Sequence, residues 1–348
     1  VADVNINPDN PVINIRSFGE DPVKVADKVI AYASGLESGK VLSVCKHFPG
    51  HGDTDVDSHK ALPVLPFTRE RLDSVELYPF KEAIRAGVSG MMVGHLQVPV
   101  IEPIGDLPSS LSRNVVYGLL TEELAFKGLI FTDALAMKGV AGNKSVCLQA
   151  LQAGNDMVLA PRRLKEEMDA VLEAVEKGEL PEEEINAKCR KVLTYKYILG
   201  LERKPFVKLS GLGTRINTPQ TRDLISRLNL AAITVLNNKN DVLPLHPDLK
   251  EAAILNVGKP EEIEPFDRKM KKYTSFARFQ LRKDLPEAEQ QKLRDSLAAY
   301  RRVIVTVTEQ RLAPYQSFFA KFAPESPVIY VFYTPAKSML QIQRAVSA

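Results

Sequence analysis

The segment Lys46–His59, with the sequence KHFPGHGDTDVDSH, constrains this chain more than any other. It brings three histidines, three aspartates and a lysine together around two glycines and a proline. The apolar stretch Val41–Cys45 before it predicts a short buried strand, and the proline and glycines after it predict that this strand ends at Cys45. We therefore expect a dense set of titratable groups on a loop at the carboxyl end of a strand. In parallel α/β folds, that is where chemistry is carried out.

Length and composition set the class of protein. The 348 residues are enough for two domains, and 45% hydrophobic and 26% charged residues are ordinary for a globular chain. The net charge of +3 and the scattered basic residues argue against a nucleic-acid partner. No segment reaches the roughly 18 apolar residues of a membrane span. Cys45, Cys147 and Cys189 lie far apart, which predicts no disulfide framework, and Cys45 is expected in the core.

The order of elements up to about residue 205 indicates a parallel sheet. Strands are expected at Val1–Val4, Val41–Cys45, Gly90–Val93, Leu129–Thr132 and Met157–Leu159, and helices at Pro22–Ser38, Thr68–Ala86, Asn114–Leu124, Ser145–Ala153 and Leu164–Lys177. Because most of these strands run into polar or glycine-marked loops, we expect an α/β fold of the (β/α)8 TIM-barrel type. Only five of the eight strands are evident, so the N-terminal strands are expected to be missing from this chain.

The rest of the chain is expected to form a second α/β domain. Pro181–Leu199 predicts a helix. Residues 1–205 are predicted to be the catalytic barrel, 206–219 a linker and 220–348 the second domain, incomplete at its end. Within it, we expect a helix that runs into a strand over Gln220–Leu236, and buried strands at Ala252–Val257, Val303–Thr308 and Val328–Tyr333. The chain starts at Val1 without a methionine, so its compartment stays open.

Metal and cofactor sites are not expected. Asp53, Asp55 and Asp57 alternate as in a calcium-binding loop, but that loop needs a glycine and a glutamate where this chain has Ser58 and Val64. The histidines lack the helical frame of a zinc motif, and no segment completes a phosphate-binding glycine loop. The sequence therefore predicts neither a metal nor a cofactor.

The remaining chemistry is acid–base and nucleophilic. Asp57 precedes His59 by two residues, so in an extended loop its carboxylate can orient the ring. The alternative is a capping aspartate beside a surface histidine, which is the commoner meaning of an isolated pair. Asp133 ends the apolar stretch Leu129–Thr132 and is either a nucleophile or a helix N-cap. Arg16 either binds an anion or hydroxyl groups, or pairs with a carboxylate.

Taken together and in order, these segments resemble glycoside hydrolase family 3, and within it the β-N-acetylglucosaminidase branch. The most distinctive motif is KHFPGHG at Lys46–Gly52, followed by Asp57-Ser58-His59. The other matching segments are Asn7–Ile13, Arg16–Gly19, Gly94–Pro99 and Thr132–Met137. This resemblance spans residues 1 to about 200, and Asn229–Leu245 is similar to the start of the family's second domain.

The resemblance implies a retaining exo-β-N-acetylglucosaminidase that acts on peptidoglycan or chitin fragments through a covalent glycosyl-enzyme intermediate. Asp133 is then the nucleophile, and His59 is the general acid/base, assisted by Asp57. Three further residues are expected to contact the sugar: Arg16, Lys46 and His47. The family also uses an upstream aspartate to hold sugar hydroxyls, and its segment is expected to precede Val1.

Alternatives remain open. The chain could be another β-glycosidase of the same family, or a phosphorylase that uses phosphate in place of water. It could also be a non-catalytic sugar-binding domain, if the natural protein lacks the N-terminal strands. A carbohydrate is the expected partner in each case. The aglycone, the oligomeric state and the role of the second domain stay open.

Overall fold

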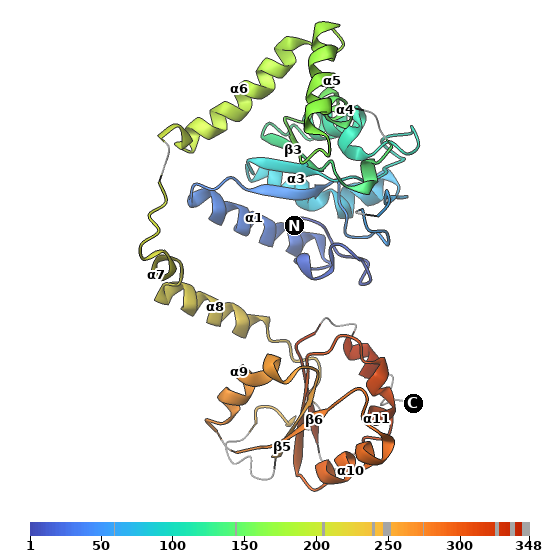
Figure 1. Ribbon diagram of the computed structural model, residues 1–348, viewed down its shortest axis with the longest axis vertical. Coiled ribbons are helices and arrows are strands. Elements are labelled where there is room, and N and C mark those ends of the chain that lie inside the picture. The colour runs from blue at the N-terminus through green and yellow to red at the C-terminus, as the bar shows by residue number, and fades with distance from the viewer. Residues whose placement is uncertain are drawn as a thin grey trace. The chain divides into compact units, whose positions relative to one another are not determined.

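The structure is a computed structural model that describes residues 1–58, 60–142, 145–203, 206–238, 241–245, 252–273, 275–323, 327–334 and 338–342. The chain divides into two compact units, Val1–Val207 and Lys208–Ala348. Each unit contains a parallel sheet with helices between its strands, which confirms the predicted α/β class (Figure 1).

The first unit is built on a four-stranded sheet. Its strands are β1 (Val44–Phe48), β2 (Gly90–Val93), β3 (Leu129–Ala134) and β4 (Met157–Leu159). They lie side by side in chain order, and every pair is parallel. The strands therefore end at one common edge, as in a TIM-type βα repeat. Within the described part of the chain, this sheet does not close into a barrel.

Helices precede, connect and follow the strands of the first unit. They are α1 (Pro22–Ser38), α2 (Arg69–Arg71), α3 (Tyr78–Arg85), α4 (Val146–Ala153), α5 (Leu164–Glu176) and α6 (Glu182–Ile198), with π-helical segments η2 (Leu72–Glu76) and η4 (Asn114–Glu123) and short 3-10 turns η1 (Asn14–Arg16), η3 (Ser109–Leu111), η5 (Lys138–Val140) and η6 (Leu201–Arg203). The bounds of α1 agree with the prediction because its end signals are strong. The Asp21 carboxylate accepts hydrogen bonds from the amides of Val23 and Lys24, and Pro22 opens the helix.

The core of this unit lies between the sheet and the helices α1 and α3. Phe48 of β1 is fully buried, and its ring meets that of Phe80 edge to face with 5.5 Å between centroids. Burial of such a ring contributes about 1.5–3 kcal/mol. Cys45 is also buried in this core, as predicted, and burial raises the pKa of its thiol to about 12. That thiol is therefore protonated at neutral pH.

The structure differs from the strands predicted at Val1–Val4 and Val41–Cys45. Residues 1–4 form no strand, although the Ala2 amide donates a hydrogen bond to the Lys46 carbonyl at 2.6 Å. The strand predicted to end at Cys45 instead runs from Val44 to Phe48. Burial of Phe48 keeps the backbone in the sheet up to the proline, so the strand itself carries the first titratable residues of the motif.

The helix predicted over Thr68–Ala86 is interrupted. The π-helical segment η2 lies between α2 and α3, and Pro79 stands at the start of α3. Because proline has no amide hydrogen, it is tolerated in the first turn of a helix and starts a new one here.

The second unit holds a parallel sheet of order β6-β5-β7-β8, formed by β5 (Ala252–Val257), β6 (Ala277–Leu281), β7 (Arg302–Val307) and β8 (Val328–Phe332). Its helices are α7 (Leu212–Ile216), α8 (Pro219–Ala232), α9 (Pro260–Met270), α10 (Glu287–Ala298) and α11 (Gln316–Ala320), preceded by the turn η8 (Ala313–Tyr315). The three strands predicted to be buried are found within a residue of their expected bounds, but β8 is half-buried along its whole length. Sequence reasoning missed β6, whose polar Arg278 and Gln280 break the apolar run.

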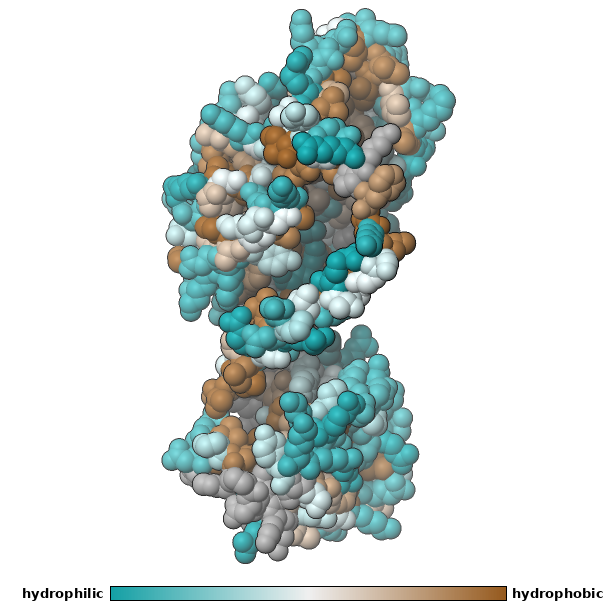
Figure 2. Space-filling model, turned by 90° about the vertical axis from the view of Figure 1, so that its left-hand side faces the viewer, coloured by the Kyte–Doolittle hydropathy of each residue, from teal (hydrophilic) through white to brown (hydrophobic). Residues whose placement is uncertain are grey.

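The strand expected at the end of Gln220–Leu236 is absent. Residues 233–238 carry no regular structure, and the apolar side chains of Ile233, Val235 and Leu236 are exposed. The segment predicted as a linker contains the short helix α7. Figure 2 shows apolar side chains at the surface among hydrophilic ones. No helix in the described ranges is both long and apolar enough to cross a bilayer.

Candidate active site

His47 occupies a bulge at the carboxyl end of β1. Lys46 pairs with Met92 and Phe48 pairs with Val93, so His47 is the extra residue between them. A bulge of this kind redirects a side chain relative to regular pleating. It lets the Cys45 and Phe48 side chains both enter the core while the His47 ring lies elsewhere, only 4% exposed.

A buried aspartate holds the His47 ring. The Asp3 carboxylate is fully buried and accepts hydrogen bonds from the amides of His47 at 3.0 Å and His51 at 2.8 Å. Its second oxygen lies 2.9 Å from His47 Nδ1. Burial by itself would raise the pKa of Asp3, but the charge and hydrogen bonds of His47 outweigh it and lower that pKa to about 2. Asp3 is therefore ionised at neutral pH.

Sequence reasoning missed Asp3. The signal was a single charged residue inside the apolar stretch Val1–Val4, because a carboxylate that is buried without a partner is very costly. Its partners lie 44 and 48 residues further along the chain, so the sequence alone did not identify them.

The proposed nucleophile lies beside the same imidazole. Asp133 is near the end of β3, and its Oδ2 is 4.0 Å from His47 Nε2. The side chain of Asp133 is 21% exposed, so it can be reached from solvent. Gly94 follows the intervening strand β2, and a Cβ there would lie 3.2 Å from the Cβ of His47. The absence of a side chain at Gly94 thus gives His47 room beside the end of β3.

A second histidine, His95, supports the end of β3. Its Nε2 lies 3.1 Å from the carbonyl oxygen of Ala134, so this nitrogen carries the proton and donates. Its Nδ1 lies 2.7 Å from the hydroxyl of Ser110, which must then donate to it. His95 is fully buried, and its bond to the residue after Asp133 positions the end of that strand.

The loop after β1 is held by buried polar contacts. The Thr54 hydroxyl donates to the His51 carbonyl at 3.1 Å, so it accepts from His51 Nδ1 at 2.7 Å. Burial lowers the pKa of His51, so the ring is neutral and its Nε2 accepts from the Ser58 hydroxyl at 3.1 Å. The Ser58 carbonyl accepts from the Gly139 amide at 3.2 Å. Ser58, between Asp57 and His59, is thereby tied to the turn that follows β3.

The other predicted site residues have different surroundings. Asp57 is half-buried, and its carbonyl accepts hydrogen bonds from the amides of residues 60 and 61. His59, the predicted acid/base, lies outside the described residues. Arg16 is exposed on η1, and its guanidinium donates to the Val12 carbonyl of its own turn at 3.2 Å. Of the predicted set, the structure places His47 directly beside Asp133.

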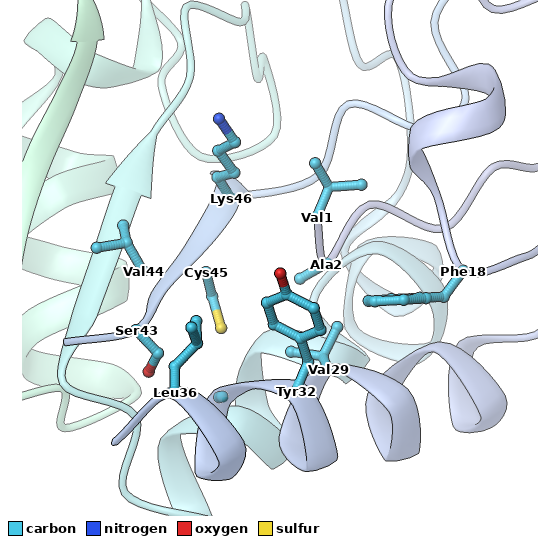
Figure 3. Close-up of a pocket in the computed structure, with 11 residues that line it drawn as sticks. Val1, Ala2, Phe18, Val29, Tyr32, Leu36, Ser43, Val44, Cys45 and Lys46 are labelled. Carbon is cyan, nitrogen blue, oxygen red and sulfur yellow. The ribbon is translucent and has the colours of Figure 1, made fainter. Parts of the chain in front are cut away.

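Lys46 lines a cavity of about 360 Å³ between α1 and β1. The other lining residues are Val1, Ala2, Phe18, Val29, Tyr32, Ala33, Leu36, Ser43, Val44 and Cys45. Figure 3 shows the Lys46 ammonium extending away from Tyr32 and Leu36. Neither His47 nor Asp133 lines this mostly apolar cavity, and the Cys45 thiol in it is protonated. The cavity therefore lacks the acid–base groups of the His47–Asp133 site.

No group of three or more histidine, cysteine, aspartate or glutamate side chains is placed to hold a metal ion in the ranges the structure describes. The predicted absence of a metal and a cofactor stays a prediction.

Comparison with known proteins identifies the family. Residues 1–195 match the Glycosyl hydrolase family 3 N terminal domain. The chain belongs to glycosyl hydrolase family 3. It is 35% identical over 266 residues to Beta-hexosaminidase A of Pseudoalteromonas piscicida, covering 70% of this chain and 44% of that protein. It is 27% identical over 256 residues to a Beta-N-acetylglucosaminidase/beta-glucosidase of Cellulomonas fimi, covering 70% of this chain and 45% of that protein.

The similarity extends to solved structures. A glycoside hydrolase family 3 beta-N-acetylglucosaminidase from Paenibacillus sp. str. FPU-7 has a TM-score of 0.81 and 29% sequence identity, covering 98% of this chain and 68% of that chain. This likeness confirms the resemblance to the β-N-acetylglucosaminidase branch and the TIM-type α/β fold. The chain spans about half the length of the curated relatives it matches.

Proposed function

We propose that the protein is a retaining exo-β-N-acetylglucosaminidase. It removes terminal β-linked N-acetylglucosamine from peptidoglycan or chitin fragments through a covalent glycosyl-enzyme intermediate. The names of the relatives support this substrate class. The observation that carries the proposal is the partly exposed Asp133 carboxylate at the end of β3, 4.0 Å from the buried His47 imidazole. The proposal includes the domain limits 1–205, 206–219 and 220–348.

In the first step, Asp133 attacks the anomeric carbon and forms an ester, while His59 protonates the leaving oxygen. In the second step, His59 takes a proton from water, which hydrolyses the ester. An imidazole suits both roles because its pKa lies near neutrality. Asp57, two residues before His59, orients that ring. The proposal assigns contacts with the sugar to Arg16, Lys46 and His47.

The hydrogen bonds that hold Ser58 in the loop after β1 support this assignment. Ser58 is held by His51 and by the Gly139 amide, so the backbone that follows Asp57 lies beside the turn after β3. A general acid must come within hydrogen-bonding reach of the leaving oxygen, and this tie keeps the loop near the nucleophile strand.

The direct test is Asp133→Ala in the intact protein. Loss of the nucleophile should lower kcat on an activated aryl β-N-acetylglucosaminide by about 1,000-fold or more, with the substrate still bound. Asp73→Ala is the matched control, because the Asp73 carboxylate pairs with Arg69 and Lys81 and not with a proposed site residue. Near-normal turnover of Asp133→Ala would show that Asp133 is not the nucleophile.

Two further assays separate the alternatives. An aryl β-glucoside tested beside the N-acetylglucosaminide distinguishes another β-glycosidase of the family. Added phosphate distinguishes a phosphorylase, since it would accelerate turnover and yield a sugar 1-phosphate. Absence of turnover on every glycoside, together with measurable sugar binding, would favour the non-catalytic alternative.

A further inference from the structure

Asp3 contacts His47 at Nδ1, whereas Asp133 faces the other ring nitrogen, Nε2. The His47 side chain is 5% exposed, and Asp3 is fully enclosed. An ionised carboxylate only accepts hydrogen bonds, so the Nδ1 atom of His47, 2.9 Å away, must carry a proton. The pKa of Asp3 is lowered to about 2, so its carboxylate is ionised throughout the neutral pH range and Nδ1 stays protonated there.

The proton on Nδ1 determines whether the other ring nitrogen, Nε2, accepts or donates a hydrogen bond. When the ring is neutral, its Nε2 has a lone pair and no hydrogen. Nε2 is the atom that lies 4.0 Å from Asp133 Oδ2. This separation is too long for a direct hydrogen bond, and a substrate hydroxyl beside Asp133 could donate to Nε2. The tautomer of His47 thus determines whether Nε2 accepts or donates beside the nucleophile.

The Asp3 carboxylate also fixes the position of the His47 imidazole. Its Oδ1 accepts from the amides of both His47 and His51, which closes the turn between β1 and the loop. The His47 and His51 rings meet edge to face at 6.0 Å between centroids. Backbone and ring are therefore held by one group, with Oδ1 binding the two amides and Oδ2 binding the imidazole.

We propose that Asp3 is a positioning residue that holds His47 in the Nδ1-protonated tautomer and so presents its Nε2 to the reaction centre beside Asp133. Its effect on the reaction rests on the proposed function. The tautomer itself does not, because it can be measured without any substrate.

Asp3→Asn separates geometry from protonation. The amide oxygen can still accept from the two backbone amides, while the NH2 group replaces the acceptor that faced Nδ1. Because that NH2 donates, Nδ1 should lose its proton and Nε2 should gain one. A carboxylate-to-amide change that forces the wrong histidine tautomer lowers kcat by about 10⁴ in a serine-protease triad, so we expect a loss of about 100-fold or more here.

The primary measurement is the ¹⁵N spectrum of the histidine rings in the intact protein. The chain has five histidines, and His47→Gln identifies the signal of His47. We expect a protonated Nδ1 in the unsubstituted protein, and a protonated Nε2 in the neutral ring of Asp3→Asn. Asp73→Asn, the matched control, should leave the His47 signal unchanged. An unprotonated Nδ1 in the unsubstituted protein overturns the proposal, whether or not Asp3→Asn folds.

A double-mutant cycle measures the coupling in turnover. If Asp3 acts through His47, the two substitutions should not add. The kcat of the double variant, Asp3→Asn with His47→Gln, should then lie within about threefold of the kcat of the worse single variant. Losses that multiply would mean that Asp3 acts independently of His47, and would overturn the proposal. If the unsubstituted protein hydrolyses no N-acetylglucosaminide, the proposed function fails, and the tautomer measurement still decides the role of Asp3.

Discussion

Protonation of the Asp3 carboxylate should make the first unit less stable in acid. The perturbation is Asp3→Asn, which keeps the shape of the side chain and removes its charge. The pKa of Asp3 falls from an ordinary 3.8 to about 2 in the folded chain. At about 1.4 kcal/mol per pKa unit, this difference corresponds to about 2 kcal/mol of stability at neutral pH.

The sign follows from the lowered pKa. A carboxylate with a depressed folded-state pKa stabilises the protein above its unfolded pKa, and the contribution is lost as the pH falls through the folded value. Here the window lies between pH 3.8 and about 2, and roughly half of the contribution is gone near pH 3. A loss of about 2 kcal/mol still leaves a domain of ordinary stability folded at neutral pH.

The assay is urea unfolding from pH 7 down to pH 2.5, with hydrogen exchange of β1 peptides to follow the first unit separately. Asp3→Asn should be about 2 kcal/mol less stable than the unsubstituted protein at pH 7, and the gap should narrow below pH 4. Asp169→Asn is the control, because its exposed carboxylate pairs with Lys165 of the same helix. Equal stability at pH 7, or a gap that stays constant down to pH 2.5, would refute the reasoning.

Three further predictions concern the loop and the chemistry. Gly52→Ala should destabilise the first unit by about 1–3 kcal/mol and lower its Tm, because the new Cβ would lie 1.9 Å from the Val4 carbonyl oxygen. The control Gly105→Ala should leave Tm unchanged, because the space around Gly105 is open. His59→Ala should reduce kcat/KM much more on substrates with poor leaving groups than on activated ones, and Asp57→Ala should do so more mildly; equal losses on both substrates would indicate a structural role. Chelation should not change activity in an aryl glycoside assay, and a loss restored by added calcium or zinc would contradict the predicted absence of a metal.

The α/β class and many of the elements followed from local patterns. The bounds of α1, β2 and β4 agree with the prediction because each has clear local signals, such as the capping Asp21 of α1. The order of motifs around KHFPGHG and Thr132–Met137 was enough to indicate the family, since such motifs are contiguous in sequence. The polar strand β6 was missed because its alternation resembles that of a surface segment.

The sequence by itself therefore determined the fold class and the titratable residues that stand at the ends of strands. Only the tertiary structure decided how they meet. The bulge at His47 depends on pairing with β2, and the contact of His47 with Asp3 and Asp133 joins three segments far apart in the chain. The physical reason is that a buried carboxylate is stable only with partners, and packing of the sheet supplies those partners. A local sequence pattern does not identify these partners.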